Sequence, residues 1–120
     1  MKKEDNMQLL VIILNKTEHL SQLLNSMLKR NICGATVLDS TGMIKVISEQ
    51  SVEPPSIFGS LREFINPSRE SSKTIFMVLP DEKIETAKSI VKEVTGGFDK
   101  PDTGIMFTIP VSYAEGIMMV

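Results

Sequence analysis

The chain has 120 residues and a net charge of −2, with 42% hydrophobic and 23% charged residues. This length and balance fit one folded domain spanning 1–120 and exclude a disordered polymer. The lack of a basic excess, together with no Trp and one Tyr, argues against a nucleic-acid binder, which needs cations and stacking rings.

The first predicted elements are a short apolar strand and an amphipathic helix. Residues 9–14 form an unbroken apolar run, which is typical of a buried strand and is too short to span a membrane. Thr17 is a favourable N-cap for the helix that follows. The apolar residues of this helix recur at helical spacing: Leu20, Leu23, Leu24, Met27 and Leu28. Gly34 then interrupts the chain, and a second strand is expected from Ala35 to about Gly42.

The same pattern occurs again in the second half of the chain. Residues 74–79 form another buried strand, 82–94 an amphipathic helix that Gly96 and Gly97 end, and 105–111 a last strand. Two strand–helix–strand units joined by a long connection predict an α+β, ferredoxin-like split βαβ fold with an antiparallel sheet.

The first and third strands lack the alternation of apolar and polar residues that is expected when one face of a sheet meets water. Two helices of this length cover only one face of a four-stranded sheet, so the other face needs another partner. A second copy of the chain is the simplest partner, and we therefore predict a homo-oligomer.

The connection between the two units, residues 43–73, is far longer than the about 4–6 residues usual in compact domains. Its start, 43–47, can extend the second strand. After a Pro-Pro pair, residues 57–65 can form a short amphipathic helix that ends before Pro67. Its apolar side chains Phe58, Leu61 and Phe64 are either a docking stripe for a target protein or a stripe packed on the protein's own sheet.

The chain has a single cysteine, Cys33, and a single histidine, His19. One of each does not make a metal site or a catalytic thiol–imidazole pair, so we predict neither a bound metal nor an enzyme activity. A single cysteine forms no internal disulfide, which favours a reducing, cytoplasmic location. We expect Cys33 to be buried beside Gly34 because free cysteines usually are.

Three stretches resemble the PII-type nitrogen-regulatory signal proteins: 9–15 leading into the helix at Thr17, Gly34-Ala35-Thr36-Val37 leading to Gly42, and 98–111. The end of the last stretch, a glycine-bearing loop before Ile105-Met106-Phe107-Thr108-Ile109-Pro110-Val111, is the most specific. The resemblance implies a trimer of ferredoxin-like subunits that binds adenine nucleotide and 2-oxoglutarate in clefts between subunits. It also implies a long loop after the second strand that carries the signal to channels and enzymes.

The phosphate-binding motifs of that family are altered in this chain. Where the family has Gly-Asp-Gly-Lys before the last strand, this chain has Asp102-Thr103-Gly104-Ile105. The family also has arginines after that strand, whereas residues 116–120 are uncharged. Each charge-assisted contact contributes roughly 1.5–3 kcal/mol, so we expect the standard ATP and 2-oxoglutarate site to be degenerate.

The identity of the cofactor stays open between a nucleotide and another small anion. The predicted ligand-binding residues are Gly42, Arg62, Arg69, Lys73, Lys100, Thr103 and Gly104. For the segment 102–104 the alternative is a plain turn, and for the basic residues of the long loop it is a solvated surface.

The sequence therefore predicts a PII-like trimeric regulatory protein that binds a small anion between subunits and regulates a target protein through 43–73. The alternative is a trimeric metal-binding protein resembling the divalent-cation-tolerance proteins, which have a similar fold. RNA-recognition domains and acylphosphatases also share the strand order. Residues 9–14 and 74–79 do not supply the aromatic-rich strands and basic face of the first class. Asn15-Lys16 stands where the second class needs an arginine-bearing anion loop.

Overall fold

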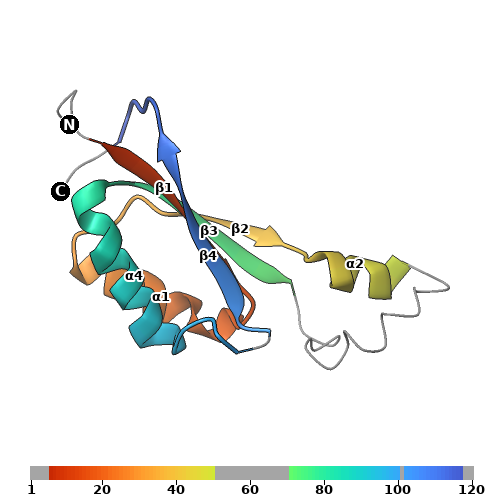
Figure 1. Cartoon of the computed structure of the whole chain (residues 1–120). Helices are drawn as coiled ribbons and strands as arrows, with labels where there is room; N and C mark the ends of the chain where they lie inside the picture. Colours follow the sequence, from red (N-terminus) through yellow and green to blue (C-terminus); the bar gives the residue numbers. More distant parts are fainter. Residues whose placement is uncertain (1–5, 51–70, 101, 118–120) are drawn as a thin grey trace.

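Two strand–helix–strand units make up the computed structural model, which describes residues 6–50, 71–100 and 102–117 (Figure 1). The first unit consists of β1 (Met7–Leu14), the 3-10 helix η1 (Thr17–His19), α1 (Leu20–Lys29) and β2 (Thr36–Ser40). The second consists of β3 (Ser72–Pro80), α4 (Asp81–Thr95) and β4 (Gly104–Val111), and a further helix, α2 (Met43–Gln50), follows β2. The predicted order of strands and long helices is confirmed.

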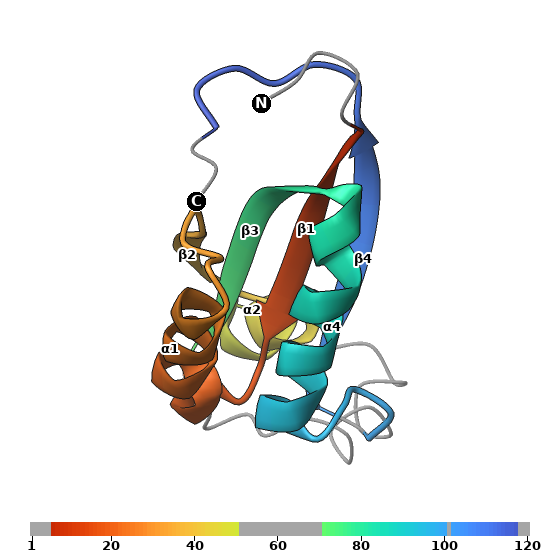
Figure 2. The same ribbon diagram turned by 90° about the vertical axis from the view of Figure 1, so that its left-hand side faces the viewer.

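The four strands form one sheet in the order β2-β3-β1-β4, in which every neighbouring pair is antiparallel. The two apolar strands, β1 and β3, lie in the centre, and β2 and β4 form the edges. Helices α1 and α4 lie side by side over one face of the sheet (Figure 2). This arrangement is the predicted ferredoxin-like α+β fold.

The hydrophobic core lies between the sheet and these two helices. Alternate residues of the central strands point into it, because successive side chains of a strand face opposite sides. Its fully buried members include Leu10, Ile12, Leu14, Leu23, Met27, Ile75, Met77, Ile90 and Val91. Fully burying one such side chain contributes about 1.5–3 kcal/mol, so this layer is the main source of stability.

The two long helices end differently. Helix α4 ends as predicted at Gly96, which has a φ of 83° and whose N–H donates to the carbonyl of Lys92 at 2.8 Å. Helix α1 ends earlier than Gly34, because Asn31 adopts a φ of 62° and Ile32 N–H bonds back to Met27 at 2.9 Å. Asparagine tolerates this left-handed conformation better than most residues.

Three expectations from the sequence are wrong. Thr17 is not an N-cap: it lies inside η1, and neither η1 nor α1 begins with a side-chain cap. Residues 43–47 do not extend the second strand, because β2 ends at Ser40 and Gly42 begins α2 by accepting a 3.1 Å bond from Val46 N–H. Cys33 is exposed, because the buried place in that connection belongs to Ile32.

Candidate ligand-binding site

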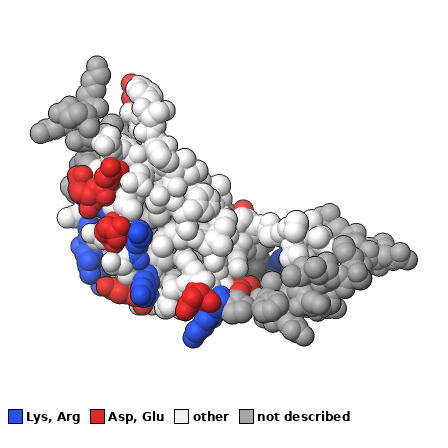
Figure 3. Space-filling view, viewed as in Figure 1, with Lys and Arg blue, Asp and Glu red and all other residues white. Residues whose placement is uncertain are grey.

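The sheet face that the helices leave uncovered is largely apolar, and we call it the open face. The register aligns its residues in rows across the sheet, and one row joins Phe76, Val11 and Phe107. Its apolar members are Leu9, Val11, Ile13, Leu38, Phe76, Val78, Ile105, Phe107 and Ile109, and the register places Thr36, Ser40, Ser72 and Thr74 on the same face near β2. The outer ones are well exposed, with Ile105 at 54% and Leu38 at 50%. Charged side chains gather over the helical layer, whereas the surface over the sheet in this view is largely uncharged (Figure 3).

The predicted anion-binding turn lies where β4 begins beside the end of β1. Gly104 has a φ of 141°, a conformation that L residues rarely adopt. A Cβ on Gly104 would overlap the carbonyl oxygen of Ile13 and come within 3.2 Å of the Phe98 ring. Glycine is therefore required at this position for strand packing, whether or not a ligand binds.

Thr103, beside it, is almost fully buried, with 5% of its surface exposed. Its hydroxyl donates to the carbonyl of Lys100 at 2.7 Å, and its own carbonyl accepts the N–H of Asn15 at 3.2 Å. The Thr103 side chain thus holds the turn together, and its role in binding a ligand stays a prediction. Lys100 is exposed at the surface of the same turn.

The predicted glycines lie at opposite edges of the sheet. Gly42 follows edge strand β2, whereas Gly104 begins the other edge strand, β4. Both lie at the same end of the sheet, but three strand spacings separate them, which is on the order of 14 Å. Within one copy of the chain the two glycines therefore do not share a site.

Lys73 belongs to a different environment from Gly104. It faces the helix side of the sheet, as does its register partner Leu14, and its ammonium pairs with the carboxylate of Asp39 on β2. These two side chains line a cavity of about 310 Å³ with Thr17, Lys45 and Ser71, which we call the α2 pocket. Of these five residues, the sequence analysis predicted only Lys73 as a ligand-binding residue. The opposite charges of residues 39 and 73, one on each side of the long connection, could have indicated that these two residues pair.

Hydroxyl groups join β2 to β3 at the same end of the sheet. Ser40 and Ser72 hydroxyls lie 3.1 Å apart, and the Ser72 hydroxyl also reaches the Ser40 carbonyl at 3.2 Å. Thr74 donates to the Ser40 hydroxyl at 2.7 Å, and the hydroxyls of Thr41 and Ser71 lie 3.3 Å apart. Side-chain hydroxyl contacts therefore hold together the end of β2 and the start of β3, where the long connection begins and ends.

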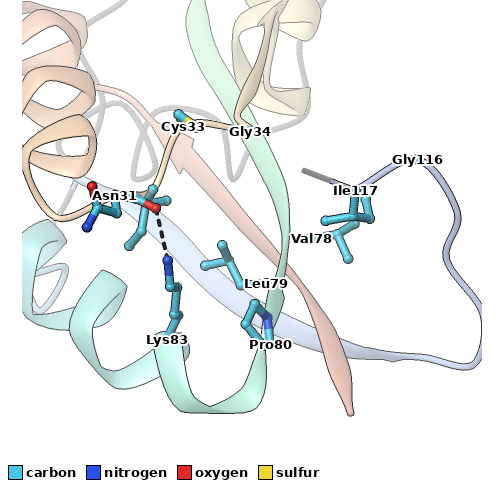
Figure 4. Close-up of a pocket in the computed structure, with 10 residues that line it drawn as sticks. Asn31, Cys33, Gly34, Val78, Leu79, Pro80, Lys83, Gly116 and Ile117 are labelled. Carbon is cyan, nitrogen blue, oxygen red and sulfur yellow. Dashed lines mark hydrogen bonds between the residues drawn. The ribbon is translucent and has the colours of Figure 1, made fainter. Parts of the chain in front are cut away.

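The exposed Cys33 lines a second cavity of about 310 Å³ at the opposite end of the sheet. Figure 4 shows Asn31 and Lys83 on one side of it and Val78 and Ile117 on the other, with Lys83 Nζ donating to the Asn31 carbonyl at 3.0 Å. Its walls are mostly aliphatic. A lone thiol in a mostly aliphatic cavity does not define a chemistry.

The segment after β4 carries a tyrosine with a shifted pKa. The exposed Tyr113 hydroxyl donates to Glu115 at 2.8 Å. This hydrogen bond, with a smaller contribution from desolvation, raises the pKa of Tyr113 above its ordinary value.

Several predicted residues lie outside the described ranges. These are the loop cations Arg62 and Arg69 and the stripe Phe58, Leu61 and Phe64. Within the described ranges, no cluster of three or more His, Cys, Asp or Glu residues could hold a metal ion. None of the helices described there is long and apolar enough to cross a membrane.

No protein-family model matches this sequence, and no curated protein matches it. Solved structures do match its fold. PII from Arabidopsis thaliana, solved bound to citrate, is 17% identical over 93% of this chain and 83% of its own, with a TM-score of 0.60. B. subtilis GlnK, solved with ATP, is 14% identical over 89% of this chain and 83% of its own, again at 0.60.

A functionally unknown protein from Pediococcus pentosaceus is similar over almost its entire length. It is 14% identical, with 94% of this chain and 99% of that one covered and a TM-score of 0.62. The three structures thus share the fold of this chain over most of its length, despite low identity. The chain has the fold of the PII proteins.

Proposed function

We propose that this chain is a PII-like regulatory protein that works as a trimer, binds a small anion between its subunits and acts on a target protein through 43–73. The open face is the observation that carries the proposal. Its exposed apolar residues adjoin one another across the sheet, and a large contiguous apolar surface on a protein marks an interaction site. The likeness to PII proteins favours three copies with their open faces together.

The separation of the predicted ligand-binding glycines within one subunit supports a site between subunits. Gly42 and Gly104 lie at opposite edges of one sheet, so a cleft that uses both needs the edge of a neighbouring copy. The ligand of such a cleft would be a small anion or nucleotide held chiefly by backbone N–H groups, because Ile105 replaces the lysine of the resembling family.

Helix α2 supports a role for 43–73 in binding a target protein. It projects away from the sheet and the two covering helices (Figure 1). Met43 is 72% exposed and Val46 36% exposed, so this helix presents apolar surface to its surroundings. A projecting amphipathic helix is a common means of docking to a groove on a partner. We propose no enzyme activity, and a cytoplasmic location stays a prediction from the single cysteine.

The assembly is tested by sedimentation equilibrium on the wild-type protein and two charge variants. Ile109→Asp places a carboxylate on the open face, where the side chain is 46% exposed in one copy. We expect it to dissociate the trimer while each copy stays folded, because an unpaired charge buried at an interface costs several kcal/mol.

The matched control is Ser89→Asp, which adds the same charge at an exposed position of α4. It should leave the measured mass unchanged. A wild-type protein that is monomeric and well folded at micromolar concentration would contradict the proposal, because the open face would then need no cover.

A further inference from the structure

Strand β4 is an edge of the sheet that its sequence protects very little against pairing. It has eight residues, Gly104–Val111, and none of them is charged. Proteins usually prevent unwanted pairing at a free edge with charged side chains, bulges or very short strands. The other edge strand, β2, follows this rule, because it has five residues and carries Asp39. An uncharged edge of the length of β4 is therefore suited to pair with a further strand.

The hydrogen bond at the start of β4 shows which of its backbone groups point away from the sheet. Asn15 N–H donates to the carbonyl of Thr103 at 3.2 Å, and in an antiparallel pair the residues that bond each other alternate along the strand. The odd-numbered residues of β4 therefore bond to β1, whereas the N–H and carbonyl groups of Met106 and Thr108 point outward. Pro110 belongs to the same outward set, which fits a residue that has no N–H to give to the ladder.

A groove lies beside this edge on the helix side of the sheet, and we call it the α4–β4 groove. It consists of two cavities, of about 320 and 330 Å³, that share Glu85, Lys88 and Met106. Figure 2 shows α4 and β4 beside each other at one edge of the molecule. The apolar side chains of the first cavity are Val91, Phe98 and Met106, and those of the second include Leu10 and Ile84. Each cavity is large enough to hold an apolar side chain from a partner.

The cavities and the outward backbone groups match in position. Met106 lines both cavities and Thr108 lines the second. A strand added to β4 would bond to the backbone of these two residues, and its side chains at i and i+2 would lie on the same face of the sheet as theirs. One such side chain would then enter each cavity. In this mode of recognition the main-chain bonds provide affinity and the cavities provide selectivity.

The charges on the rim of the groove favour an acidic residue in the partner. Glu85 and Lys88 pair with each other at 3.0 Å. The ammonium group of Lys92 forms no ion pair with any residue that the structure describes, and Lys92 lines the first cavity together with Phe98. A carboxylate at that end of the groove would be attracted to Lys92, and a further lysine would be repelled.

We propose that the α4–β4 groove binds an extended segment of a target protein as a further strand, antiparallel to β4 like every other neighbour in this sheet. In this direction the segment passes Thr108 before Met106. Apolar residues at i and i+2 therefore occupy the second and then the first cavity, and an acidic residue follows them near Lys92. The groove lies on the side of the sheet opposite the open face and does not include 43–73, so this contact goes beyond the proposed function.

Fluorescence anisotropy with a dye-labelled, capped peptide of sequence Thr-Leu-Thr-Leu-Thr-Asp tests the binding. Methylating the backbone nitrogen of both leucines should weaken binding at least about tenfold, because it removes the two donors that would bond to β4. Methylating the second and third threonines, whose N–H groups would point away from β4, is the matched control and should change binding by no more than about twofold. This comparison uses the wild-type protein and does not depend on the folding of any variant.

Protein variants test the same contacts from the other side, with circular dichroism to confirm that each is folded. Thr108→Pro removes an outward N–H and should weaken binding about tenfold, whereas Thr108→Ala keeps this N–H and should bind within about twofold of the wild type. Lys92→Gln should weaken the peptide about threefold, and it should not affect a peptide with Asn in place of Asp. The matched control is Lys29→Gln, which removes a lysine from α1 and should affect neither peptide.

Two further measurements separate this proposal from the proposed assembly. Amide hydrogen exchange of Met106 and Thr108 should slow when the peptide binds, because their N–H groups become paired. The non-assembling Ile109→Asp variant should bind the peptide as tightly as the wild type, since Ile109 belongs to the open face. A wild-type protein that is monomeric and still binds the peptide would contradict the trimer and support the groove.

The proposal is overturned if the wild type does not bind the peptide at millimolar concentration, or if methylation of the leucines has no larger effect than methylation of the threonines. Binding by Ile109→Asp but not by the wild type would overturn it as well, because the β4 edge would then be covered by a neighbouring copy of the chain. Unchanged exchange of Met106 and Thr108 at saturating peptide would refute the pairing with β4.

Discussion

Replacing Gly104 by alanine tests the close contact between the start of β4 and the end of β1. Two costs add at this position. A φ of 141° costs a residue with a Cβ about 1–3 kcal/mol. The new methyl group would also overlap the backbone oxygen of Ile13, and backbone yields only if the two strands move apart. We therefore expect Gly104→Ala to lower the free energy of unfolding by at least about 3 kcal/mol.

Alanine substitutions at two other glycines measure the cost of backbone strain separately from the cost of the steric overlap. Gly96 has a φ of 83°, but no atom lies within 4 Å of the place where an alanine methyl group would sit, so Gly96→Ala should cost about 1–2 kcal/mol from backbone strain alone. Gly34 has neither a left-handed φ nor a near neighbour, and Gly34→Ala should be neutral or slightly stabilising. Urea denaturation followed by circular dichroism, at one fixed protein concentration, gives the three values. If Gly104→Ala unfolds at the same urea concentration as Gly34→Ala, the close contact between the strands does not exist.

Three further outcomes are expected. Calorimetry with magnesium and ATP should give no tight binding, because Ile105 and the uncharged 116–120 supply no cation; a submicromolar Kd would show that other cations have replaced them, with Lys100 the first to mutate. Glu115→Gln should lower the raised pKa of Tyr113 toward the ordinary value, since the carboxylate stabilises the neutral phenol. Because the chain has one Tyr and no Trp, ultraviolet absorbance of the phenolate reports this group alone, and an unchanged titration would contradict the hydrogen bond. Ser72→Ala should destabilise the protein by roughly 1–2 kcal/mol, since the buried hydroxyl joins β3 to Ser40; thermal unfolding identical to that of the wild type would show that the hydroxyl bonds contribute nothing.

Long apolar runs and clear helix stops made most of the fold predictable from sequence. Residues 9–14 and 74–79 are unbroken apolar segments, and they became the two central strands. The prediction failed for 43–47 because a short run containing Met, Ile and Val fits either a strand or one face of a helix. The prediction that Thr17 caps a helix failed because Thr17 lies inside the 3-10 helix η1. No pattern in the sequence predicted this short helix.

The candidate site was less predictable, because its residues come together only through the sheet register. Asp39 and Lys73 are distant in sequence, and their pairing follows from the alignment of β2 with β3. Lys45 joins them only because the chain turns into α2 at Gly42. The exposure of Cys33 could not be predicted from the sequence either. Free cysteines are usually buried, but in this connection the neighbouring Ile32 takes the buried position.

The hydroxyl contact at 3.3 Å between Thr41 and Ser71 means that a span of about thirty residues begins and ends at one point. The entropy of closing such a loop rises only slowly with its length, by about 0.6 kcal/mol for each doubling. Insertions, deletions or a foreign sequence between these two positions therefore change the stability of the sheet very little. Evolution, or a protein engineer, can exchange the sequence between these two positions without redesigning the core.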